Sequence, residues 1–157
     1  MPDRGPQIRN RLAEVLAAAS PARTVYRDRS AFSATERPCR VLLYGRETIH
    51  HNFENRAGRV YARTAPSVML MEPEIFELLR VREPKKSGEY APELEASLKA
   101  IHHAIVNDEE LVALTGDSGD IAYRGFTTDF ELGASMEGAM QIHFRFYYVL
   151  NPETDLA

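Results

Sequence analysis

The stretch MQIHFRFYYVL, residues 140–150, alternates apolar and polar side chains along most of its length. Successive side chains of a β-strand point to opposite faces of its sheet, so this alternation predicts a strand with one buried face. Ile142, Phe144 and Phe146 are expected on the buried face, and His143 on the polar face. We therefore expect an antiparallel sheet in which this last strand of the chain lies inside the sheet.

The segments before it complete a closing unit of helix and hairpin. Residues 121–132 are expected to pair with residues 137–150 through a turn of small residues. Before them, apolar residues at helical spacing predict a helix. These residues are Leu94, Leu98, Ile101 and Ile105. A further helical turn is expected to be capped by Asn107 and ended by Gly116.

The first half of the chain adds another helix and several strands. Residues 6–19 are predicted to be helical, and 24–27 and 40–44 to be strands. Strand-like runs follow at 59–70 and 74–81. Pro73 lies between them and predicts an edge, a bulge or a break.

The order predicts one α+β domain over residues 1–157, in which a mostly antiparallel sheet is packed on one side by two main helices. The polar segment 46–58 is expected to protrude as a loop or hairpin. The predicted core consists of Leu12, Leu98, Ile101, Ile142, Phe144 and Phe146.

Charge is distributed unevenly along the chain. Up to Arg63 there are twelve arginines and six acidic residues, a net charge of +6, so the remainder has −10 because the whole chain has −4. Such asymmetry favours an anionic partner for one face or a self-complementary, head-to-tail assembly. The alternative is that both sets of charges mix on the folded surface. Cys39 is the single cysteine, and no apolar run is long enough for a membrane span.

No motif predicts a catalytic or metal site. Gly116-Asp117-Ser118-Gly119 copies a serine-protease segment, but its composition is that of a turn and it lacks the partners of a triad. The histidines are scattered as His50-His51, His102-His103 and His143, which does not match zinc-ligand spacing. Glu72, Glu74 and Glu77 are interpreted as a solvated strand face. Tyr123, Phe126 and Phe130 are interpreted as core residues. We expect no enzyme activity, cofactor or bound metal.

The whole layout resembles the tail terminator, or tail completion, proteins of tailed bacteriophages. The resemblance covers residues 8–150 and rests on the order of segments. These segments are the opening helix IRNRLAEVL (8–16), the strand TVYRDR (24–29), the strand PCRVLLY (38–44), the helix with Leu94, Leu98 and Ile101, and the closing FRFYY (144–148). The middle, residues 59–81, is longer and more continuous than in that family.

The resemblance implies a helix-backed antiparallel sheet and a homohexameric ring at the head-proximal end of the tail tube. The protein would stop tail polymerisation and offer a surface to the head-tail connector protein. Its partners would be itself, the tail tube protein, the connector, and DNA that passes through the lumen without sequence-specific binding, with no membrane. Its place would be the tail neck of a virion that is assembled in the host cytoplasm.

Candidate interface residues come from the arginine-rich half and from the 46–58 segment. They are Arg27, Arg29, Arg46, His50, His51, Asn52, Arg56 and Arg59. Two other functions stay open on the sequence. One is another neck or head-closure adaptor of the virion. The other is a small metal-dependent enzyme on an α+β scaffold, for which the histidines would have to converge.

Overall fold

Five strands form one mixed, mostly antiparallel sheet in the order β1-β2-β3-β5-β4 in the computed structural model. The strands are β1 (Thr24–Arg27), β2 (Cys39–Asn52), β3 (Ser67–Leu78), β4 (Ile121–Glu131) and β5 (Glu137–Leu150). The structure describes residues 4–20, 23–29, 31–32, 34–52, 67–79, 90–116, 121–131 and 137–151. Only β1 and β2 are parallel, and every other neighbouring pair is antiparallel. The predicted α+β class is confirmed.

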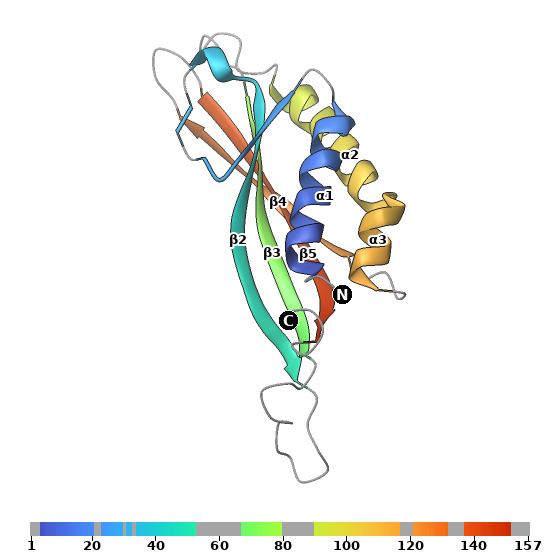
Figure 1. Cartoon of the computed structure of the whole chain (residues 1–157). Helices are drawn as coiled ribbons and strands as arrows, with labels where there is room; N and C mark the ends of the chain where they lie inside the picture. Colours follow the sequence, from blue (N-terminus) through green and yellow to red (C-terminus); the bar gives the residue numbers. More distant parts are fainter. Residues whose placement is uncertain are drawn as a thin grey trace.

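The helices lie together on one side of this sheet (Figure 1). They are α1 (Arg4–Ala19), α2 (Tyr90–Val106) and the short α3 (Glu109–Thr115), and a 3-10 turn, η1 (Ala34–Glu36), precedes β2. Alternate residues of β5 point toward the helices, and Ile142, Phe144 and Phe146 among them are buried as predicted. Leu12 and Ile101 meet them from the helix side, while Leu98 is only partly buried at the margin of the core.

Pro73 lies inside β3, a central strand, and not at an edge or a break. The distortion it requires is absorbed by β2, whose pairing with β3 shifts between Leu43 and Arg46. Gly45 occupies this bulge with φ +69°. A Cβ at Gly45 would lie 2.1 Å from the carbonyl oxygen of Glu72, so only glycine fits against β3 at this point.

The cap of α3 lies one residue later than predicted. Asp108, not Asn107, is the N-cap, and its carboxylate accepts a hydrogen bond of 3.0 Å from the backbone N–H of Leu111. Asn107 instead donates its side-chain amide to the carbonyl of His103 at the end of α2. Gly116 ends α3, as predicted.

Of the loop and the hairpin that were predicted as alternatives for residues 46–58, the described part of this segment matches the hairpin. Residues 46–52 continue β2 and pair with β3, so they form one arm of a long hairpin. The sequence looked loop-like because these residues are polar on an exposed strand, where polarity does not exclude extended structure. Residues 53–58 lie outside the described part of the chain.

The side of the sheet opposite the helices, called here the open face, is covered by described residues at one end only. There Tyr26 and Phe32 pack on a small second cluster formed by Cys39, Val41 and Leu78. The middle of the open face is hollowed.

Candidate functional site on the open face

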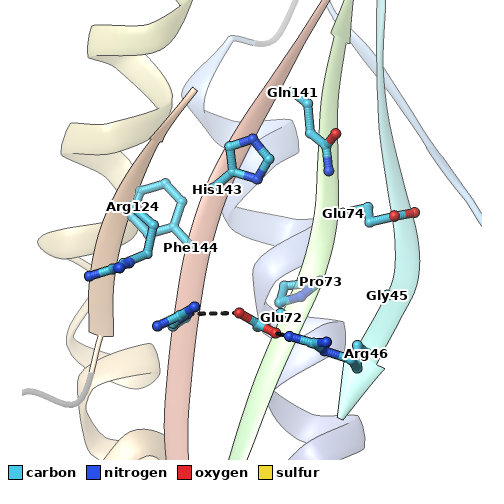
Figure 2. Close-up of a pocket in the computed structure, with 10 residues that line it drawn as sticks. Gly45, Arg46, Glu72, Pro73, Glu74, Arg124, Gln141, His143 and Phe144 are labelled. Atoms are coloured by element: carbon cyan, nitrogen blue, oxygen red, sulfur yellow. Dashed lines mark hydrogen bonds and ion pairs between the residues drawn. The ribbon is translucent and has the colours of Figure 1, made fainter. Parts of the chain in front are cut away.

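The hollow on the open face has a volume of about 650 Å³ and crosses four strands. Its described lining residues are Gly45, Arg46, Glu72, Pro73, Glu74, Arg124, Gln141, His143, Phe144 and Arg145. Most of these side chains are charged or polar, and Figure 2 shows those from β2, β3, β4 and β5 side by side on the sheet.

Glu72 stands at the centre of this hollow between two arginines. Arg46 from β2 donates its Nε to Glu72 Oε2 at 2.9 Å, and Arg145 from β5 donates its Nε to Oε1 at 2.7 Å (Figure 2). These hydrogen bonds hold the pKa of Glu72 below its usual range, and the bond from Arg46 has the largest effect. One carboxylate therefore serves two guanidinium groups, and Glu72 is unsuited to act as a general acid or base at neutral pH.

Three other polar side chains of the hollow have no hydrogen bond or ion pair with any residue that the structure describes. Arg124, on the edge strand β4, is exposed, and Glu74 and Gln141 are half-buried. Glu74 lies directly opposite His143 across the β3–β5 pair. His143 itself shares a hydrogen bond of 3.2 Å with Thr127. Charges of both signs are thus available to an incoming surface.

The two bulges of the sheet place the arginines of this site. The shift at Gly45 puts Arg46 beside Glu72 on the open face. A second shift, between Tyr123 and Phe126, accompanies Gly125 with φ +95° and leaves Arg124 in the hollow while Phe126 stays on the helix side, opposite Ile142.

The predicted interface residues whose side chains the structure describes lie in different places on the fold. Arg46 belongs to the hollow, whereas Arg27 donates to Asn10 on α1 at 2.8 Å. Arg29 donates to Glu36 at 2.8 Å, and its guanidinium lies 4.8 Å from the centre of the Phe32 ring. The His50 ring contacts that of Tyr147, with the ring centres 5.1 Å apart. His51 and Asn52 end β2, with side chains outside the described set, and Arg56 and Arg59 lie outside the described residues.

The uneven charge of the sequence is partly compensated inside the folded chain. Arg11 of α1 bonds to Asp108 at 2.6 Å, and Arg23 bonds to Glu93 of α2 at 3.2 Å. Arg9 pairs within the first half, with Glu47 at 3.1 Å. Some early arginines therefore pair with later carboxylates inside one subunit, which weakens the argument that the two halves must pair across neighbours.

Glu77 corrects the interpretation of Glu72, Glu74 and Glu77 as a solvated face. It is fully buried on the helix side and accepts hydrogen bonds from Arg40 Nε at 2.7 Å, Arg23 Nε at 2.9 Å and Ser97 Oγ at 3.2 Å. Arg40 is also fully buried and donates to the carbonyl of Leu16 at 2.9 Å. The alternation of β3 puts odd-numbered residues toward the helices, and Glu77 shares that parity.

The histidines stay apart. His102 stacks on Tyr123 with ring centres 4.3 Å apart, and His143 lies on the open face, as its place in the alternation predicted. Within the described ranges no group of three or more His, Cys, Asp or Glu side chains is placed to hold a metal ion. Of the protease-like segment, Gly116 is the C-cap of α3, and residues 117–119 are not described.

Sequence reasoning missed Arg124 and Arg145 as site residues. The polar side of the 140–150 alternation indicated that Arg145 faces away from the core. The position of Arg145 beside Glu72 depends on the order of strands in the sheet, which a local sequence pattern cannot predict. Phe126 was also assigned to the core, but it is 49% exposed because β4 is the outermost strand.

Comparison with models of known protein families gives no match, and comparison with curated proteins gives none either. No helix among the described residues is both long enough and apolar enough to span a membrane.

Proposed function

We propose that this protein is a structural component of a tailed phage, which assembles as a six-membered ring on the head-proximal end of the tail tube. The ring ends polymerisation of the tube and offers its outer surface to the head-tail connector. The observation that carries the proposal is the open face, where polar side chains from four strands surround a hollow and charges of both signs have no partner among the described residues.

Such a face suits a protein partner better than a small substrate. The described lining includes no serine, threonine, cysteine or lysine nucleophile, and Glu72 is held by Arg46 and Arg145. Arg124 and Glu74, which have no partner among the described residues, can pair with opposite charges on a flat or ribbed protein surface. The helix-backed α+β sheet is also the architecture that the resemblance to tail terminators implies.

The test is removal of the gene from a phage that carries it, with the wild-type gene supplied in trans as the control. We expect unattached heads together with tails of irregular, excessive length, because nothing then stops addition of tube subunits. Negative-stain images give the distribution of tail lengths. Tails of normal length that fail to join heads would identify a head-side adaptor instead, and normal virions would reject both assignments.

The same system tests the open face directly. Complementation with Arg124→Glu should reduce the yield of joined particles, because it reverses a cation of the hollow that has no partner among the described residues. Lys99→Glu, an exposed charge reversal on α2, is the matched control and should complement as the wild type does.

A further inference from the structure

The described part of the chain leaves two outer edges of the sheet without a partner strand. β4 is one edge, and the other is the second half of β2, because β1 pairs only with the first four residues of that strand, 39–42. Within the described ranges no strand pairs with either edge. A long strand edge without a partner is a template for pairing with another chain. Each of these edges could therefore pair with a strand from another chain.

Each uncovered edge carries an exposed apolar side chain. Phe126 in the middle of β4 is 49% exposed, and Ile49 in the second half of β2 is 57% exposed. Phe126 lies opposite Ile142, and Ile49 lies opposite Met69, so both belong to the helix side of the sheet. If the two edges were joined, the two side chains would fall on the same face.

The strand directions allow that junction. β2 and β5 run one way, and β3 and β4 run the other. β4 of one copy, laid beside β2 of a second copy in the same orientation, would make an antiparallel pair like three of the four pairs inside the subunit. The two edges differ, so the contact is head-to-tail and repeats around a ring.

A groove beside Phe126 provides a seat for an apolar side chain. It lies between α2 and the β4–β5 hairpin, has a volume of about 160 Å³, and is lined by Leu94, Leu98, Phe126 and Met140, with Glu95 at its rim. An isoleucine on an added strand would face this groove, since it lies on the helix side of the sheet.

We propose that a second copy of this chain completes the sheet, with the second half of its β2 paired to β4 and the partner's Ile49 seated against Phe126 and Leu98. The proposal rests on the ring of the proposed function and names the joint of that ring.

The experiment uses two aspartate variants of the full chain, Phe126→Asp and Ile49→Asp. Both side chains are about half exposed, so neither substitution places a charge in the core. Sedimentation velocity over a range of concentrations should give assemblies for the wild type and monomers for each variant. The control is Val149→Asp, which is 42% exposed but lies on the open face of β5, outside the two edges of the proposed joint, and should assemble as the wild type does.

An equimolar mixture of the two variants is the decisive sample. The Phe126→Asp chain keeps its β2 edge and the Ile49→Asp chain keeps its β4 edge, so one intact joint forms between them. We expect a dimer of one chain of each kind and nothing larger, because both remaining edges are blocked.

Several outcomes would overturn the joint. They are a wild type that stays monomeric at its highest soluble concentration, variants that assemble normally, and a mixture that stays monomeric. If only Phe126→Asp blocked assembly, two β4 edges would be joined and the head-to-tail arrangement would be wrong. If gene removal gave excessively long tails while the assembly experiment gave any of these results, the proposed function would stand and only the proposed joint would be rejected.

Discussion

Gly45 shows at the scale of one residue how the open face obtains its shape. Both Gly45 and Gly125 have positive φ, which disfavours any side chain. A Cβ at Gly45 would also lie 2.1 Å from the Glu72 carbonyl oxygen and 2.8 Å from Cα of Pro73, whereas nothing lies within 4 Å of one at Gly125. The bulge brings the backbones of β2 and β3 close together at Gly45. This close approach places Arg46 beside Glu72 on the open face.

Alanine substitution of these two glycines separates the cost of a positive φ angle from the cost of a clash with the β3 backbone. Gly125→Ala should lower the free energy of unfolding by about 1–2 kcal/mol, the cost of a left-handed backbone. Gly45→Ala should lower it by clearly more, because the β3 backbone must also move. Urea denaturation of both variants measures the difference. Equal losses would show that β2 and β3 separate freely at the bulge.

At the scale of elements, the sequence predicted most helices and strands because their side-chain periods are local. The alternation in 140–150 and the stripe from Leu94 to Ile105 are each confirmed. What the sequence left open or misassigned depended on neighbours in space. Residues 46–52 form a strand because β3 pairs with them, and Phe126 is exposed because no described strand lies outside β4. The candidate site was not predicted from the sequence for the same reason, since it joins residues of four strands.

The junction of α1 and α3 is another contact between elements, and it should depend on pH. Asp108 caps α3 and also accepts two hydrogen bonds from Arg11, at 2.9 and 2.6 Å. The bond from Arg11 holds the pKa of Asp108 below its usual range. A carboxylate with a lowered folded-state pKa adds stability above its unfolded pKa of about 4, and that stability is lost as pH falls through the folded value.

Two substitutions separate the cap from the ion pair. At pH 7, Asp108→Ala should lower the free energy of unfolding by about 0.5–2 kcal/mol through loss of the cap, with a further loss from the Arg11 pair. Asp108→Asn retains a good cap and should lose less. The wild type and Asp108→Asn should converge as pH falls through the lowered folded-state pKa of Asp108, because the carboxyl group of the wild type then becomes protonated. A gap independent of pH would contradict the ion pair.

At the scale of the whole molecule, buried charge connects the layers. Glu77 of β3 receives Arg40 from β2, Arg23 from the chain before β1 and Ser97 from α2, while Arg40 also reaches the end of α1. One carboxylate therefore links the sheet to both long helices. These arginines are engaged inside the subunit, so a joint between copies has to draw on other surfaces, such as the apolar sheet edges and the unpaired charges of the hollow.

Glu77→Gln tests this connection with little change in shape. Removing the negative charge leaves the fully buried Arg40 without its counter-ion, and breaking a buried pair in this way costs about 3–5 kcal/mol. Glu74→Gln is the matched control, because Glu74 lies three residues away on the open face and has no partner among the described residues. We expect thermal unfolding of Glu74→Gln to stay close to wild type, and Glu77→Gln to unfold at a much lower temperature or to fail to fold. A small loss in Glu77→Gln would mean that Arg40 reaches water or another acceptor when its carboxylate is removed. The layers would then be held together by the apolar core and by other pairs between them, such as Arg9 of α1 with Glu47 of β2.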